Sequence, residues 1–125
     1  MSGVDLVLVA LGGAAGASSR HLVVGWAQRA LGATPTGGTV LVNVVGSFVL
    51  GLVAAVVASG GPGWVLALVG AGWCGAFTTF SSHAVEVAAA LRAGRARVAV
   101  VNLAVSLLGC LLVVVLGWTL GSALA

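Results

Sequence analysis

Four apolar stretches, each about long enough to cross a lipid bilayer, constrain the fold of this chain more than any other feature. They cover approximately residues 4–26, 39–58, 64–91 and 98–120. A membrane-spanning helix needs about 20 apolar residues. Only 6% of the residues are charged, whereas soluble domains carry about 25%. We therefore expect a single-domain, all-α membrane protein of four helices, lying as a multi-pass protein in the plasma (cell) membrane.

Short segments rich in glycine, proline or arginine separate these stretches and are typical of turns. They fall at residues 32–38, 59–63 and 92–95. Pro35 and Pro62 are both expected in loops, where a proline interrupts no helical hydrogen bond. The sequence thus predicts short connections and almost no mass outside the membrane. Because so small a bundle can hardly enclose a solvated pathway alone, we expect it to form an oligomer.

The first apolar stretch resembles a signal peptide only superficially. No Lys or Arg precedes Arg20, so the basic region that begins a signal peptide is missing. We expect this stretch to be retained as the first helix. Its Gly12 and Gly16 form a G-x-x-x-G pair, which lets two helix backbones approach closely. The pair serves contacts either within one subunit or between subunits.

The basic residues are five arginines, and their positions predict an orientation. Arg29, Arg92, Arg95 and Arg97 flank the loops after the first and third helices, and the other side of the membrane receives none. Basic loops stay on the cytoplasmic side, so both termini are predicted outside. The arginines form no stripe along one face, which argues against a nucleic-acid partner despite the sequence pI of about 10.3.

A polar cluster at Gly72–Ser82, G-W-C-G-A-F-T-T-F-S-S, interrupts the third apolar stretch. At bilayer depth such groups line a pathway or hold an ion, which favours transport over simple anchoring. The third stretch is also long for one straight helix, so two half-helices meeting near Gly75–Thr79 are one interpretation. The other is an intact helix whose hydroxyls bond back to the preceding turn. The residues alone leave both open.

Enzymatic chemistry has no support in the sequence. There is no phosphate-binding glycine loop, no catalytic triad and no closed metal site. Cys74 and Cys110 stand singly in apolar runs, without a C-x-x-C motif, and are expected to be small packed helix residues. We therefore expect neither an enzyme nor an actively driven pump.

Three motifs together identify a family. They are G-G-A-A-G-A-S-S-R at Gly12–Arg20, G-T-V-L-V-N-V-V-G-S-F-V-L-G at Gly38–Gly51, and the polar cluster extended to Glu86. In this order and spacing the chain resembles the four-helix fluoride channels of the Fluc (CrcB-type) family over nearly its whole length. The resemblance implies an antiparallel (inverted) dimer with fluoride pathways along the subunit interface. It also implies a third helix broken near its centre.

The resemblance further implies one structural Na⁺ where the broken helices of two subunits cross. Gly75 and Thr78 match the positions whose backbone carbonyls bind this ion, which is held and not transported. Na⁺ is a hard cation that prefers oxygen ligands, and a helix break is where spare carbonyls occur.

Matching positions also imply a fluoride pathway. Asn43 would donate from its NH₂ group, and Phe80 would present its electropositive ring edge to the anion. Arg20 matches a first-helix arginine, with packing support at least as plausible as an ion contact. The other matched positions carry hydroxyls or a carboxyl: Thr39, Ser81, Ser82, Glu86 and Ser106. Asn102 and Cys110 flank Ser106 and rank lower.

Two features depart from the family pattern. His83 replaces a second pore phenylalanine and is as consistent with a functional contact as with a degenerate position. The arginine bias fixes one orientation, whereas an inverted homodimer requires both. The partner is therefore either a second copy or an oppositely oriented paralogue.

The sequence thus predicts a fluoride channel subunit that lets F⁻ leave the cytoplasm passively. The alternatives are a proton-coupled exporter of the small multidrug type and a non-conducting partner subunit. The exporter would need a membrane-embedded carboxylate in the first helix, where only Asp5 occurs near the start.

Overall fold

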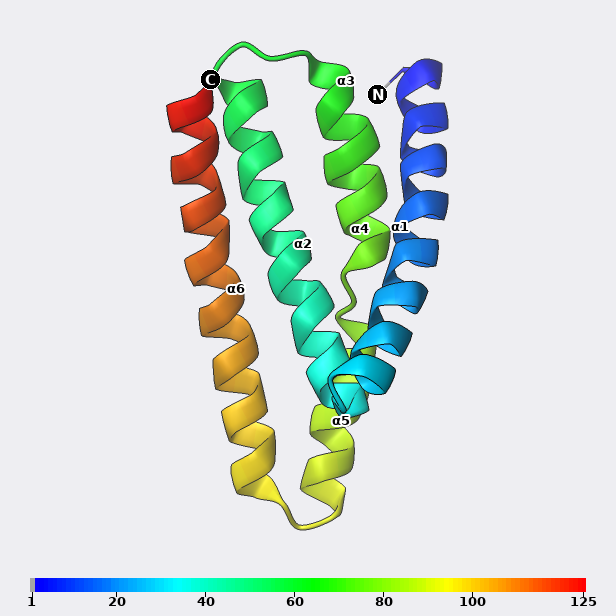
Figure 1. The fold of residues 1–125 in the computed structure, drawn as a ribbon, viewed down its shortest axis with the longest axis vertical. Helices are drawn as coiled ribbons and strands as arrows, with labels where there is room; N and C mark the ends of the chain where they lie inside the picture. The colour runs from blue at the N-terminus through cyan, green and yellow to red at the C-terminus, as the bar shows by residue number, and fades with distance from the viewer. Residues whose placement is uncertain (1) are drawn as a thin grey trace.

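The computed structural model describes residues 2–125, Pro35 by its backbone only, and these residues are helical apart from short connections (Figure 1). Four helical crossings are long and apolar enough to span a membrane, which confirms the predicted all-α class. The third crossing is divided into several elements. In chain order the elements are α1 (Gly3–Ala30), α2 (Pro35–Ala58), α3 (Gly63–Val65), the π-helical η1 (Leu66–Cys74), α4 (Gly75–Phe77), α5 (Ser81–Arg92) and α6 (Ala96–Leu124).

The starts of α1 and α2 are set by capping residues. At α1, Ser2 Oγ accepts from Asp5 N at 3.1 Å while Asp5 Oδ2 accepts from Ser2 N at 2.9 Å. At α2, Thr34 Oγ1 accepts from Gly37 N at 3.1 Å, and Pro35 is the first helical residue. A proline fits there because the first turn does not need its missing N–H. The prediction that Pro35 lies in a loop was therefore wrong.

The third crossing is interrupted between Phe77 and Ser81. Thr78 is extended, with φ −82° and ψ 161°, and α5 begins only at Ser81. Thr78 Oγ1 also donates to Cys74 O at 2.9 Å, so hydroxyl back-bonding occurs beside the break and does not replace it. The prediction of a broken third helix is confirmed. The π-helical stretch before the break has no counterpart in the sequence predictions.

The crossings pack as two close pairs, α2 with α6 and α1 with the first half of the third crossing (Figure 1). Glycines permit both contacts. A Cβ added to Gly12 would meet Leu68 O, and one added to Gly16 would meet Trp73 O. On α6, a Cβ at Gly117 would likewise meet the backbone of α2. The G-x-x-x-G pair therefore packs helices within one subunit.

The two ends of the bundle differ in charge. The chain termini and the α2–α3 connection lie at one end, and the α5–α6 connection lies at the other (Figure 1). Arg29 and Arg92 occupy the last turns of α1 and α5, and Arg95 and Arg97 flank the start of α6. The four arginines thus lie toward the end opposite the termini.

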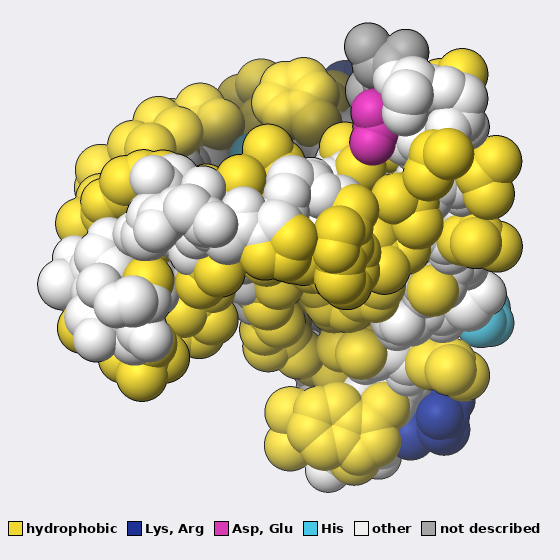
Figure 2. All heavy atoms as spheres, turned by 90° about the horizontal axis from the view of Figure 1, so that it is seen from above, with side chains coloured by type: hydrophobic (Ala, Val, Ile, Leu, Met, Phe, Trp, Pro, Cys, Tyr) yellow, Lys and Arg dark blue, Asp and Glu magenta, His cyan; other side chains and the backbone are white. Residues whose placement is uncertain are grey.

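Large apolar side chains cover the outside of the bundle. Leu11 on α1 and Leu108 on α6 are among many that are more than half exposed, and hydrophobic atoms dominate the face in Figure 2. Such a surface is stable in lipid but not in water. The chain is a multi-pass membrane protein.

Candidate functional site

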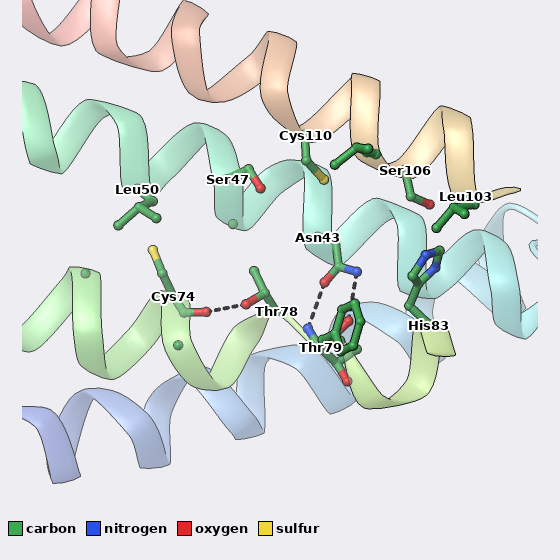
Figure 3. Close-up of a pocket in the computed structure, with 15 residues that line it drawn as sticks. Asn43, Ser47, Leu50, Cys74, Thr78, Thr79, His83, Leu103, Ser106 and Cys110 are labelled. Carbon is green, nitrogen blue, oxygen red and sulfur yellow. Dashed lines mark hydrogen bonds between the residues drawn. The ribbon is translucent and has the colours of Figure 1, made fainter. Parts of the chain in front are cut away.

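A cavity of about 400 Å³ lies where the helix break faces α2 and α6 (Figure 3). We call it the central groove. Its polar lining comes from α2, the break, α5 and α6, and its apolar lining comes from α2, η1, the break and α6. The polar side chains are Asn43, Ser47, Thr78, Thr79, His83 and Ser106, and the apolar or sulfur-bearing ones are Leu50, Cys74, Phe80, Leu103, Leu107 and Cys110.

The Asn43 side chain holds the backbone of the break. Its Nδ2 donates to Thr79 O at 2.9 Å, and its Oδ1 accepts from Thr79 N at 2.7 Å (Figure 3). One amide therefore satisfies both backbone groups of a residue that has left the helix. Unpaired groups of this kind are costly at bilayer depth. Nδ2 carries a second hydrogen, so this contact does not exhaust the donors of Asn43.

The same contact changes the surroundings of Gly75. In an uninterrupted α-helix the Thr79 amide would donate to Gly75 O, four residues earlier. Here that amide donates to Asn43 instead. Gly75 is exposed, and nothing in the subunit lies within 4 Å of a Cβ added there. The break thus frees a backbone carbonyl of its usual donor on an open face of the chain.

Thr78 is held by neighbours on α1 and α2. Its carbonyl accepts a hydrogen bond from Arg20 Nη1 at 3.3 Å, so the Arg20 side chain contacts the break. A Cβ added to Gly46 would run into Thr78 Cγ2, so α2 approaches the break closely only because residue 46 is glycine. A carbonyl has two lone pairs, and Arg20 uses one of them on Thr78 O.

Phe80 and His83 line the groove with different exposures. The Phe80 side chain is 81% exposed, whereas His83 is 7% exposed. Their ring centroids are 6.4 Å apart. His83 Nδ1 is buried and has no hydrogen-bond partner. Figure 3 shows the imidazole beside Ser106 and Leu103 of α6, where Ser106 Oγ lies 3.2 Å from Asn102 Oδ1.

The structure separates the predicted fluoride-pathway and Na⁺ residues into two groups, and it places Arg20 outside the groove lining, at the break. Those brought together in the central groove are Asn43, Gly75, Thr78, Phe80, His83 and Ser106. Those outside its lining are Thr39, Ser81, Ser82 and Glu86. Ser81 and Ser82 instead belong to the start of α5, where Thr79 Oγ1 lies 3.3 Å from Ser81 Oγ and accepts from Ser82 N at 3.2 Å.

Thr39 and Glu86 form a second polar contact, between α2 and α5. Thr39 Oγ1 donates to Glu86 Oε1 at 2.8 Å, while Glu86 Oε2 is buried without a hydrogen-bond partner. Thr39 itself is 5% exposed. This contact joins the two helices on the arginine-bearing side of the break.

Thr79 is the site residue that sequence reasoning missed. It supplies both backbone groups to Asn43 and an oxygen to the first turn of α5. A threonine just ahead of a helix is a capping signal, and Thr79 Oγ1 bonds the first turn of α5 although Phe80 is the residue directly before that helix. The signal is readable only once the break is placed. Within residues 2–125, no group of three or more His, Cys, Asp or Glu side chains is arranged to hold a metal ion.

Comparison with known proteins agrees with this architecture. Residues 7–118 match the family described as CrcB-like protein, Camphor Resistance (CrcB). A protein of Symbiobacterium thermophilum named Fluoride-specific ion channel FluC 1 is 44% identical over 121 residues, covering 90% of this chain and 96% of that protein. One of the same name from Halobacterium salinarum is 46% identical over 118 residues, covering 91% of each. The chain therefore belongs to the CrcB/FluC family of fluoride-specific ion channels.

Proposed function

We propose that this chain is one subunit of a dimeric channel that conducts F⁻ passively across the cell membrane. The observation that carries the proposal is the central groove, a chain of neutral hydrogen-bond donors at bilayer depth on a member of the CrcB/FluC family. Hydroxyl and amide donors can replace the water that a small anion loses on entering. HF crosses lipid, dissociates in neutral cytosol, and leaves F⁻ trapped. A channel would let the negative internal potential drive that ion out.

The pathway residues we assign are those with a donor or ring edge near the groove. Asn43 keeps one N–H beyond its bond to Thr79. Ser106 contributes a hydroxyl, which donates to Asn102 Oδ1 in the lone subunit and would have to turn to donate to an anion. Phe80 contributes an exposed ring whose edge is electropositive. We assign the remaining polar positions, Thr39, Ser81, Ser82, Glu86 and His83, to the approaches of the pathway and its wall.

A second subunit is part of the proposal because one chain leaves its pathway residues uncovered. Phe80 is a large aromatic residue at the centre of the protein, yet 81% of it is exposed. Gly75 is exposed beside it on the same groove. An inverted partner would cover this face and add the other wall. The four arginines at one end favour a paralogue of opposite orientation over a second copy.

The carbonyls of Gly75 and Thr78 fit the structural Na⁺ expected for the family. Gly75 O has lost its helical donor to Asn43, and Thr78 O keeps a lone pair beside its bond to Arg20. Such oxygens suit a hard cation. Two carbonyls from each of two chains would surround the ion. It would neutralise the carbonyl dipoles and join the subunits.

The rival exporter reading fits the structure poorly. It needs a carboxylate within the membrane on α1, but Asp5 is engaged in capping the first turn of that helix. A non-conducting partner subunit is favoured by two observations, the histidine in the groove and the one-sided arginines. It therefore stands as the second candidate.

A flux assay in proteoliposomes separates the candidates. Vesicles loaded with fluoride are given a K⁺ gradient and a K⁺ ionophore, and external fluoride is read with an electrode. We expect fluoride release from the channel, and no uptake of a cationic dye. Asn43→Asp is the test variant, and Ser18→Ala is the control, because Ser18 Oγ only bonds back to Ala14 O on the exposed side of α1. Flux that appears only on adding a second subunit would identify the non-conducting partner.

A further inference from the structure

His83 is a buried polar side chain whose hydrogen bonding is incomplete within the subunit. Only 7% of it is exposed, its Nδ1 has no partner, and it lines the central groove. Buried polar atoms nearly always have a partner, and each exception calls for an explanation, such as an absent ion. Asn43 lines the same groove and keeps one N–H beyond its bond to Thr79, so an anion held between Asn43 and His83 would lie within its walls.

His83 is also the only side chain lining the groove that can gain a positive charge. The α2 residues of the lining are neutral, and the titratable groups from η1 and α6 are the thiols of Cys74 and Cys110. On α5 itself, Glu86 follows one turn later and is bonded to Thr39. Arg20 on α1 donates to Thr78 O. Among residues 2–125 no salt bridge holds the imidazole, so its charge is available to an anion.

Imidazole chemistry makes this position depend on protons. In the neutral ring one nitrogen donates and the other accepts, whereas in the cation both donate. Histidine is the side chain that ordinarily changes charge between about pH 5 and pH 8. A proton taken from bulk water therefore turns Nδ1 into a charge-assisted donor, roughly twice as strong as a neutral one.

We propose that His83 is a proton-dependent anion ligand of the central groove, which binds fluoride through Nδ1–H and more tightly when the imidazole is protonated. The inference rests on the proposed fluoride channel and deepens it. Fluoride binding and proton uptake then favour each other, and by linkage the coupling is the same in both directions. Fluoride affinity rises as the pH falls, and fluoride moves the titration of His83 to higher pH.

The direct test is the titration of the histidines by NMR. The purified channel, with its partner subunit if one is required, is labelled with ¹⁵N in the imidazole rings and titrated in NaF and in NaCl at equal concentration. The chain has two histidines, and exposed His21 on α1 serves as the internal reference. A coupling of about fivefold or more predicts an upward shift of about 0.7 pH units or more for His83 in fluoride. We expect no such shift for His21.

The same titration also defines the results that would overturn the proposal. An unmoved His83 titration in fluoride, or an equal shift in chloride, removes the proposal. The readout does not depend on conduction, so a fluoride-specific shift supports the ligand even in a subunit that conducts nothing. If fluoride flux and the shift of the His83 titration are both absent, with and without a partner subunit, the channel assignment itself would be overturned.

A second test compares the ratio of fluoride flux at pH 6 to that at pH 8 in two variants of residue 83. We expect fluoride flux at pH 6 to exceed that at pH 8 in the natural protein, after subtraction of protein-free vesicles. His83→Phe removes charge and donor, and His83→Gln keeps a donor without titration. In both variants the ratio of fluoride flux at pH 6 to that at pH 8 should be one, whatever the absolute rates. A ratio that stays above one in His83→Gln would place the titrating group elsewhere and overturn the proposal.

Discussion

Asn43 and Thr79 form a reciprocal pair in which one side-chain amide bonds both backbone groups of the other residue, at 2.9 and 2.7 Å. The pair crosses from α2 to the break. It replaces the two helical hydrogen bonds that Thr79 has lost by leaving the helix. Since no water competes for these groups in a bilayer, the geometry of the break depends on residue 43.

Replacing Asn43 therefore tests both the break and the pathway. Asn43→Asp can still accept from Thr79 N but has no hydrogen to donate to Thr79 O, and its charge would repel an anion. We expect fluoride flux to fall by about tenfold or more, because a hydrogen bond to a charged partner contributes about 1.5–3 kcal/mol. Asn43→Ala should also lower thermal stability in detergent. Unchanged flux and stability in both variants would contradict the assignment.

Gly46→Ala tests the close approach of α2 to the break. The added methyl group would run into Thr78 Cγ2. Overpacking of this kind costs about 1–3 kcal/mol, so we expect a lower melting temperature and reduced flux. Gly109→Ala is the matched control on α6, because its Cβ would meet Val44 Cγ2 at an ordinary 3.8 Å. Equal melting temperatures of the two variants would show that the Thr78 side chain can move aside without a loss of stability.

Removal of sodium tests the carbonyl site. Replacing Na⁺ by N-methylglucamine should lower both flux and the dimer fraction in size-exclusion chromatography, because the carbonyl dipoles of Gly75 and Thr78 would lose their counter-charge. Gly75→Ala is the companion variant. Nothing in the subunit obstructs that methyl group, so it should leave the stability of a lone subunit unchanged and weaken only pairing. Full flux without Na⁺ would argue against the ion.

Thr39→Val tests the contact between α2 and α5. The change keeps the shape of the side chain but removes the hydroxyl that donates to Glu86 Oε1 at 2.8 Å. With Oε2 already unpartnered, the carboxyl group would lose its bond to α2, and we expect a stability loss of about 1–3 kcal/mol. Combining it with Glu86→Gln in a double-mutant cycle isolates this bond. Additive effects of the two changes would mean that the residues act independently.

Membrane orientation follows from the arginines. A reporter fused after Ala125 should lie outside the cell in nearly all molecules, because the basic loops remain on the cytoplasmic side. Removing positive charge by Arg95→Ala and Arg97→Ala should produce a population of mixed orientation. A mixed population in the natural chain would instead favour pairing between identical copies.

The helices were predictable because their cause is local, since apolar length specifies the crossings. The break was not decided by the residues alone, because the polar cluster between Gly72 and Ser82 also fits an intact helix; the family resemblance favoured the break. The start of α2 was misjudged because Pro35 was interpreted as a breaker, although the cap from Thr34 makes it a helix start.

The site was predictable in part. Asn43 and Ser106 reach the groove as expected, but the Thr79 contact joins residues 36 positions apart, and no local pattern encodes such pairing. The positions of Ser81 and Ser82 outside the lining depend on where α5 restarts. That restart follows the Thr79 backbone, which is held by Asn43 across the bundle and is therefore fixed only by tertiary structure.

The intramolecular use of Gly12 and Gly16 bears on biogenesis. Because Gly12 and Gly16 already pack against the neighbouring crossing, this pair is not available to a second polypeptide. The close contact between these two crossings can therefore form within one inserted chain, before any second subunit arrives.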